Sequence, residues 1–358
     1  MPNLLKGSHE LFRRSPDESF SSLGEILARC RDDAEGSTDR WKPPKGMKPV
    51  AEEGKLRLDL GDGNVPFSMN DWSFTQLCGL AGVGKDTLNR LSAETAGRVF
   101  SETLPGGNKP AQLFTRDNGI RSIHGHSYSR LHDSDLVSML MEFAVDFTPP
   151  QPGCTGGTGL YRGEQDLFCF MIDPTGWVEV EGEAFAPGFF AWNSEVGRRS
   201  VGVQSFWFQA VCANHIVWDA VDITEFTRKH TGKVSDALPE MRRMIEALVA
   251  KRDDRKDRFS ATIRSAMKTR VGDDIEEALK LLSTHGIRGL LAKRALDLAA
   301  NQGRFTIFSV VDALTRIAGE IANAGDRAEM DQKASRLLTM VSLPTPPWIE
   351  LNVQNGEE

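Results

Sequence analysis

The stretch that most constrains the fold of this chain is residues 185–221, where apolar and aromatic runs are separated by short polar breaks. The first break, residues 193–200, holds one carboxylate, Glu195, beside two guanidiniums, Arg198 and Arg199. The second break falls at residues 212–215. Apolar runs bounded by polar turns are typical of hairpins. The stretch therefore predicts two or three neighbouring strands with short connections.

The whole chain divides into four segments by composition and periodicity. Residues 1–54 are rich in Ser, Pro, Lys and Gly and predict a flexible N-terminal arm with one short helix inside it. Residues 55–232 predict an α+β core of antiparallel hairpins and helices, because strand-like alternation, turn residues and helical spacing follow one another. Residues 233–342 carry apolar side chains at helical spacing and predict a helical region, and residues 343–358 predict an extended tail. The expected fold class is α+β, an antiparallel sheet core with packed helices followed by a C-terminal helical region.

Composition and charge exclude several classes of protein. The 358 residues carry a formal net charge of −7, which argues against a protein coated in positive charge but allows a local basic groove. The five cysteines are odd in number and form no Cys-x-x-Cys pair, which indicates a reducing compartment. No apolar run approaches the ~20 residues of a membrane span, and the N-terminus lacks a signal-peptide pattern. We therefore expect a cytoplasmic protein without a membrane partner.

Residues 79–86, Gly-Leu-Ala-Gly-Val-Gly-Lys-Asp, resemble a phosphate-binding P-loop. The resemblance is incomplete, because Asp86 stands where the hydroxyl ligand of magnesium should be and would repel phosphate. The preceding residues also read as a helix, whereas a P-loop follows a strand. A DNA-binding helix-turn-helix is a second interpretation of the same segment. A helical hairpin with a glycine turn and no ligand is the third.

Four residues could hold a metal ion. His124 and His126 are two apart on an expected strand, and Cys212 and His215 stand at the second polar break. Together they have the ligand types of a zinc site, although nothing in the sequence brings the two pairs together. Cys212 with His215 could also form a nucleophile and base. Histidines near a sheet edge and a buried cysteine explain the same residues without chemistry, so we expect no cofactor and no catalytic residue.

Arginine and aromatic residues gather on two expected hairpins. Single strands of nucleic acid are bound by cationic groups that follow the phosphates and by aromatic rings that stack on bases. Arginine can do both. The alternative is that Arg198 and Arg199 pair with Glu195 and that the aromatic side chains are core. The candidate nucleic-acid-binding residues are Arg116, Arg121, Tyr128, Arg130, Trp192, Arg198 and Arg199.

Three blocks of residues also carry a family resemblance. They are residues 113–136 with Leu-Phe-Thr-Arg and His-Ser-Tyr-Ser-Arg-Leu, residues 193–232 with Asn-Ser-Glu-Val-Gly, Val-Cys-Ala-Asn and His-Thr-Gly, and residues 312–315 with Asp-Ala-Leu-Thr. Over about residues 55–320 the chain resembles the phage/plasmid-like protein family built on domain of unknown function 932. It departs from the family at Asn214-His215, where the family usually has Asn-Gly, and the family has no P-loop at residues 79–86.

The resemblance implies no established activity. It implies an origin in mobile elements, beside replication and recombination genes, and a core distantly similar to phage strand-annealing proteins. Fold-level analogy does not fix function. We therefore expect a protein that binds single-stranded DNA as a homo-oligomer and assists recombination or replication by strand annealing. The alternatives are an interaction protein that acts on a host factor without binding DNA, and a metal- or nucleotide-dependent enzyme.

Overall fold

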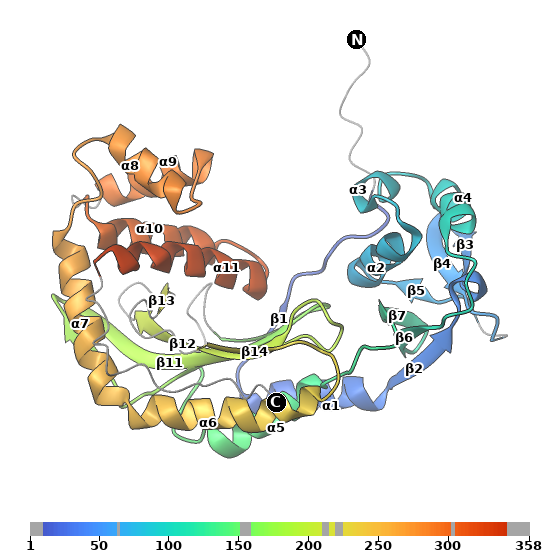
Figure 1. Ribbon diagram of the computed structural model, residues 1–358, viewed down its shortest axis with the longest axis horizontal. Helices are drawn as coiled ribbons and strands as arrows, with labels where there is room; N and C mark the ends of the chain where they lie inside the picture. Colours follow the sequence, from blue (N-terminus) through green and yellow to red (C-terminus); the bar gives the residue numbers. More distant parts are fainter. Residues whose placement is uncertain are drawn as a thin grey trace, which may run out of the picture.

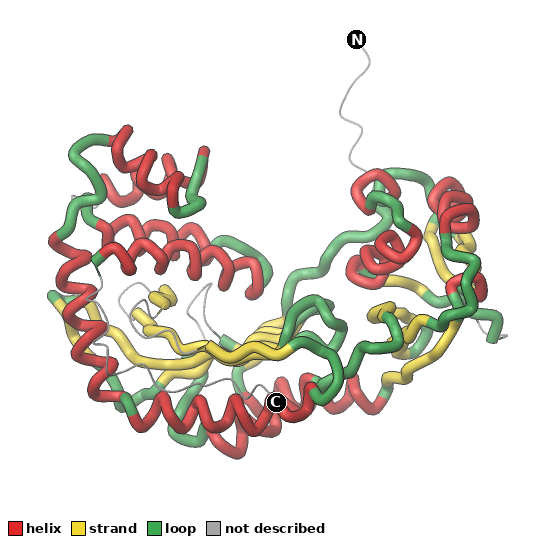
Figure 2. Tube along the Cα trace, viewed as in Figure 1, coloured by secondary structure: helices red, strands yellow, loops and turns green. Residues whose placement is uncertain are grey.

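The computed structural model describes residues 10–62, 65–150, 159–209, 215–218, 225–301 and 305–341. Figure 1 shows a long central sheet that joins two lobes. The small lobe consists of residues 37–124, and the helical lobe consists of residues 252–341. Figure 2 shows that strands run through the middle of the molecule while helices cover the sheet and form most of the helical lobe.

The central sheet is antiparallel, with strand order β1-β8-β9-β11-β12-β13, and two further strands, β10 and β14, pair with β11 and β12. The two long strands β11 and β12 lie at its centre and pair over eight positions, from Phe185↔Gln209 to Trp192↔Gly202. This pairing confirms the hairpin expected within residues 185–221. The strands are β1 (Glu18–Phe20), β8 (Leu160–Arg162), β9 (Leu167–Ile172), β10 (Val178–Val180), β11 (Glu183–Asn193), β12 (Val201–Gln209), β13 (His215–Trp218) and β14 (Glu225–Arg228).

Both faces of the central hairpin are covered, and β12 is buried at every residue. Successive side chains of a strand point to opposite faces. Phe189 and Val203 therefore pack on one side, against α1 (Leu23–Glu35), α5 (Asp133–Phe143) and α6 (Ala237–Ala250). Phe190 and Phe206 pack on the other side, against α11 (Ala324–Ser335). Near-continuous apolar sequence in these strands is what burial on both faces requires.

The small lobe has its own sheet and core. Its four-stranded sheet has the order β2-β6-β7-β5, and a separate hairpin pairs β3 with β4. The apolar faces of its helices pack on these strands. The elements are β2 (Ser37–Lys42), β3 (Lys48–Glu52), β4 (Lys55–Asp59), β5 (Ser68–Met69), α2 (Asp71–Ala81), α3 (Lys85–Leu88), α4 (Ala93–Thr103), β6 (Ala111–Arg116) and β7 (Gly119–His124), with a short 3-10 turn, η1 (Pro44–Gly46).

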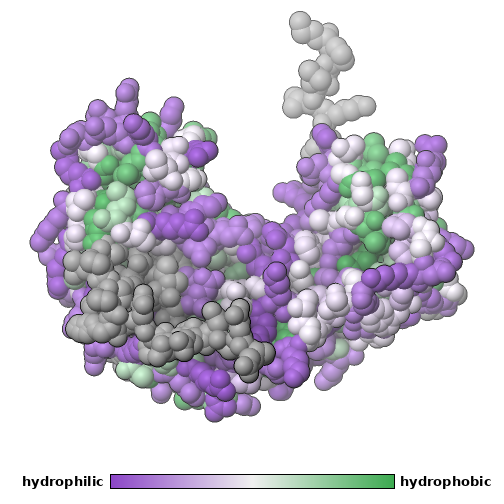
Figure 3. All heavy atoms as spheres, in the orientation of Figure 1, coloured by the Kyte–Doolittle hydropathy of each residue, from purple (hydrophilic) through white to green (hydrophobic). Residues whose placement is uncertain are grey.

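The helical lobe packs around α10, which is buried along most of its length. Its N-terminus is fixed by a capping box, in which the side chains of Thr306 and Ser309 each bond to the other's backbone N–H. Figure 3 shows the surface hollowed between the helical lobe and the small lobe. The other helices of this lobe are α7 (Arg252–Lys268), α8 (Ile275–Thr284) and α9 (Gly289–Asn301), with α10 at Ile307–Gly319 and a 3-10 turn, η3 (Arg336–Met340).

The structure differs from the flexible arm expected over residues 1–54. β1 pairs with β8, β2 pairs with β6, and α1 packs beneath the central sheet. The segment before β1 crosses between the lobes: Leu11 N–H donates to Asn89 O, and Asp17 accepts from the backbone N–H of Ala324. These partners lie far along the sequence, so the local composition of the arm did not reveal them. The extended tail expected at residues 343–358 lies outside the described residues.

The P-loop and helix-turn-helix interpretations do not fit the local structure. Gly79 lies within α2, and Gly82 ends that helix with a φ of 67°, which is the left-handed conformation common at helix ends. Lys85, the expected phosphate ligand, forms an ion pair with Asp71 at 2.7 Å. Helix α3 has four residues and is too short to read a major groove. The helical hairpin with a glycine turn is therefore the interpretation that the structure supports.

The fold class is confirmed: antiparallel sheets with packed helices are followed by a C-terminal helical region. Within the described residues, no helix is both long and apolar enough to cross a membrane.

Candidate functional site

The turn between β11 and β12 contacts both lobes. Trp72, at the start of α2 in the small lobe, donates from Nε1 to Val196 O at 2.8 Å. Arg199 pairs with Glu329 of α11 at 2.9 Å. The turn is closed by its own residues, because Gly197 N–H donates to Ser194 O and Arg198 N–H donates to Ser194 Oγ. Residues 193–200 therefore connect the central sheet to its two neighbours.

Gly197 is required by this packing. Its φ of 74° lies in the left-handed region. A Cβ at this position would lie 2.5 Å from Cε1 of His124 and 2.9 Å from Cε2 of Tyr128. Glycine is the residue that tolerates both the backbone conformation and the close approach of the rings.

A buried ion network lies behind the turn, centred on Arg162 of β8. Its Nε lies 3.1 Å from Asp133 and its Nη2 lies 3.0 Å from Glu195. Its Nη1 pairs with Asp33 of α1. Arg162 and its three carboxylates are each at most 5 % exposed. One guanidinium thus holds carboxylates from α1, α5 and the turn in a water-poor interior.

Two further basic side chains, Arg121 and His132, complete the network around Glu195. Arg121 lies 2.5 Å from Glu195 Oε1, and His132 Nδ1 lies 3.4 Å from Oε2. Burial alone would raise the pKa of Glu195, but Arg121, His132 and Arg162 hold it well below its usual range. Glu195 in return raises the pKa of His132. Glu195 is therefore the acceptor for several cations, and not for Arg198 or Arg199 as the sequence suggested.

The pKa of the neighbouring carboxyl group, that of Asp133, shifts upward, opposite to the pKa of Glu195. Burial, together with the negative charge of Glu195, raises the pKa of Asp133 to about 6. Arg162 and a hydrogen bond donated by Asn193 Nδ2 at 2.8 Å oppose that shift. The same Asn193 amide also donates to Leu131 O at 2.9 Å. Asn193 and Glu195, the first and third residues of the Asn-Ser-Glu-Val-Gly motif, are thus both part of the network.

Four of the seven candidate residues contact this network or its edge. Arg116 pairs with Asp32 at 2.7 Å and with Asp33, and Arg121 pairs with Glu195. Arg130 pairs with Asp39 at 2.9 Å and donates to Glu195 O. Tyr128 donates from its hydroxyl to Glu195 O at 2.8 Å. The charges and the hydroxyl of this group are therefore used within the fold.

The ring of Tyr128 stacks on His124, with centroids 3.7 Å apart and planes 5° apart. His124 Nε2 lies 2.9 Å from Val196 O, so its N–H donates to that carbonyl in the neutral ring. Burial and the positive charge of Arg130 lower the pKa of His124 to about 4. Burial likewise lowers the pKa of His230, whose ring lies 5.6 Å from that of Tyr128, to about 4.

The low pKa of His124 predicts a loss of stability in mild acid. The unfolded ring binds a proton near pH 6.5 and the folded ring only near pH 4, so stability falls as the pH drops through that window. At pH 5 the loss from this ring is roughly 1–2 kcal/mol. We expect His124→Gln to show a smaller decrease in unfolding free energy between pH 7.5 and pH 5.0 in urea titrations. His126→Gln, at an exposed ring two residues away, should retain the wild-type decrease; an unchanged decrease in His124→Gln would contradict this assignment.

The other three candidate residues line one pocket. Trp192, Arg198 and Arg199 lie around a cavity of about 300 Å³ between the central sheet and α11. Trp192 is only 8 % exposed and stacks on Phe190, with centroids 4.9 Å apart, so its ring belongs to the core as the alternative interpretation held. Arg198 is exposed and lies over the ring of Trp72, 5.7 Å from its centroid. The structure thus brings together an indole and two guanidiniums that the sequence had placed on one hairpin.

Arg199 is held but not fully satisfied. Its Nε lies 2.6 Å from Asp166 and its Nη1 lies 2.9 Å from Glu329. Its buried Nη2 lacks a hydrogen bond within the described part of the chain, although the carboxylate of Asp326 lies 3.9 Å away. Glu225 and Glu329 also line the pocket and oppose an anion.

The four residues with the ligand types of a zinc site cannot all be placed. His124 is engaged by Tyr128 and Val196, and His126 is exposed beyond the end of β7. Cys212 and the side chain of His215 lie outside the described residues. Within the described ranges, no group of three or more His, Cys, Asp or Glu could hold a metal ion.

Sequence reasoning missed the centre of the network. Asp33 lay in the segment expected to be flexible, and neither Asp133 nor Arg162 was among the candidate residues. The available signal was an arginine directly after the apolar pair Leu160 and Tyr161, because a charge on a buried strand needs a partner.

Comparisons of the chain with protein-family models, curated proteins and solved structures found no match. The resemblance to the family built on domain of unknown function 932 stays a prediction from the three blocks of residues.

Proposed function

We propose that this chain binds single-stranded DNA in the cytoplasm and assists recombination or replication by strand annealing. The observation that carries the proposal is the pocket that joins Trp192 with Arg198 and Arg199. An aromatic ring beside cations is the arrangement that nonspecific single-strand binding uses. We propose that the chain acts as a homo-oligomer, which would align such pockets along one strand.

The two arginines have different roles in this proposal. Arg198 is exposed, so it can contact a phosphate of the DNA backbone. Added salt should weaken this contact. Arg199 is fixed by Asp166, Glu329 and Asp326 and contributes its positive charge to the pocket rather than a free donor. Arg116, Arg121, Tyr128 and Arg130 support the turn and are left out of the DNA contact. The three arginines form ion pairs within the chain, and the Tyr128 hydroxyl donates to Glu195 O.

Fluorescence anisotropy with labelled single- and double-stranded oligonucleotides at two salt concentrations tests the proposal. We expect salt-sensitive binding that prefers single strands. Arg198→Ala should weaken it and reduce the salt slope by about 1, the value for one lost phosphate contact. Glu329→Gln should strengthen it, because a carboxylate beside the bound anion is removed. Light scattering of the same samples gives the oligomeric state.

Arg31→Ala is the matched control, because Arg31 is an exposed arginine on α1 and its removal changes the net charge equally. Its binding should equal that of the wild type. Absence of binding to either form of DNA at low salt would refute the proposal. Equal weakening by Arg198→Ala and Arg31→Ala would refute the pocket as the binding site.

A host-factor interaction without DNA is the second candidate. It is favoured by the acidic balance of the chain, −7 overall, and by the internal pairing of Arg116, Arg121 and Arg130. The anisotropy experiment separates the two candidates, since this one predicts no salt-dependent DNA binding.

A further inference from the structure

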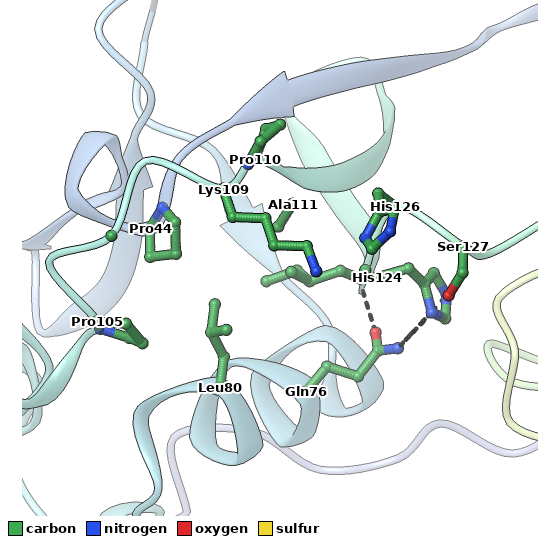
Figure 4. A pocket seen from close by; sticks show the side chains of 13 residues that line it. Pro44, Gln76, Leu80, Pro105, Lys109, Pro110, Ala111, His124, His126 and Ser127 are labelled. Carbon is green, nitrogen blue, oxygen red and sulfur yellow. Dashed lines mark hydrogen bonds between the residues drawn. The ribbon is translucent and has the colours of Figure 1, made fainter.

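A second and larger pocket lies in the small lobe, separate from the pocket lined by Trp192, Arg198 and Arg199. Its volume of about 590 Å³ is within the range of small-molecule sites, roughly 300–1,000 Å³. Helix α2 forms one side, and the segment before β6 and the end of β7 form the other. Figure 4 shows Leu80 and Gln76 rising from α2 while Lys109 extends across the pocket toward the strand end that carries His124.

Most of the lining is apolar. Leu80, Ile123, Pro44, Pro105 and Pro110 all line the pocket. Apolar walls with a few fixed polar groups are the usual construction of sites for small organic ligands. The walls therefore suit the body of a small apolar molecule.

The polar groups of the pocket are fixed in place. Gln76 Oε1 accepts from the backbone N–H of Ile123 at 2.8 Å, and its Nε2 lies 3.4 Å from the ring of His124. His124 is held in turn by Val196 O. Its lowered pKa keeps the ring neutral at pH 7. This wall is preorganised before any ligand arrives, and it carries no charge.

One charge remains, the ammonium group of Lys109. Lys109 is exposed at the pocket edge, and the described residues offer it no carboxylate within salt-bridge distance. No Asp or Glu belongs to the described lining, so a cationic ligand would find no counter-charge. A single lysine is also too little for a polyphosphate, which needs several cations or a magnesium ion.

We propose that this pocket binds a small organic monocarboxylate, with an apolar body against Leu80, Ile123 and the prolines and the carboxylate on Lys109. The site is separate from the proposed DNA pocket and does not depend on that proposal. Ser127 Oγ and the His126 ring stand at the same end of the pocket as His124 and supply further hydrogen bonds to the carboxylate.

Calorimetric titration of the full chain at pH 7 with naphthalene-2-carboxylate, and with the uncharged 2-naphthamide, tests the proposal. We expect one-to-one binding of the carboxylate, about tenfold tighter than that of the amide, because only the carboxylate forms a charge-assisted hydrogen bond with Lys109. Lys109→Met should weaken binding of the carboxylate about tenfold and leave binding of the amide unchanged. Leu80→Trp, which fills the pocket, should weaken both.

Lys55→Met is the matched control, because Lys55 is an exposed lysine of the same lobe. It should bind both probes as the wild type does. Three results would overturn the proposal: no saturable binding of the carboxylate, full carboxylate affinity in Lys109→Met, or full affinity in Leu80→Trp. Circular dichroism of each variant separates lost binding from lost folding.

Discussion

Replacing Arg162 with methionine should lower the free energy of unfolding by about 3–5 kcal/mol, because removal of one partner leaves buried charges uncompensated. The guanidinium contacts Asp33, Asp133 and Glu195 at once, and methionine fills its volume but supplies no charge. Urea titration followed by tryptophan fluorescence measures the change.

A double variant keeps this prediction testable if Arg162→Met does not fold. Asp133→Asn in the same chain removes one of the stranded carboxylates, so the double variant should be more stable than Arg162→Met alone. Arg294→Ala, which breaks an exposed pair with Glu320, serves as the control and should leave the unfolding midpoint unchanged. Equal stability of Arg162→Met and the wild type would show that the network does not hold the fold.

Replacing Gly197 with alanine should lower the free energy of unfolding by about 2–5 kcal/mol. The positive φ alone costs about 1–2 kcal/mol in a residue with a Cβ. The contact with His124, at 2.5 Å, adds about 1–3 kcal/mol of overpacking. The displaced rings also hold two carbonyls of the turn, Tyr128 that of Glu195 and His124 that of Val196, so the substitution should also disturb the pocket lined by Arg198 and Arg199.

Gly182→Ala separates the two contributions. Gly182 also has a positive φ, 88°, but a Cβ there would meet nothing within 4 Å. This variant should lose only the backbone contribution, about 1–2 kcal/mol. Chemical denaturation of both variants measures the difference, and equal losses would remove the role assigned to the ring contact.

The sequence predicted the central hairpin because its signal is local. The aromatic runs on both sides of residues 193–200 are typical of strands that are buried on two faces. Strands β11 and β12 are such strands. The fold class followed from the same kind of local pattern. Strand β1 has three residues, Glu-Ser-Phe, and is held by pairing with β8 and by contacts with α1. A segment of this kind carries too little local information to be distinguished from a flexible arm.

The candidate site was predicted in part for the same reason. Trp192, Arg198 and Arg199 are close in sequence, so one turn brings them together. The partners of Glu195 could not be predicted from its neighbours. Arg198 and Arg199 stand nearest in the chain, yet Arg121, His132 and Arg162 reach it from other elements. Which cation pairs with a buried carboxylate is decided by tertiary packing.

Residues of the ion network lie far apart in the sequence, which affects when the network can form during translation. Asp33 and Arg162 are separated by 129 positions. At a synthesis rate of about 5–20 residues per second, Asp33 leaves the ribosome on the order of ten seconds before Arg162 exists. During that interval β1 lacks β8, and the carboxylate that will be buried stays in water. The Asp33–Arg162 pair therefore cannot form until residue 162 has been made, and contacts between residues so distant in sequence favour slow folding.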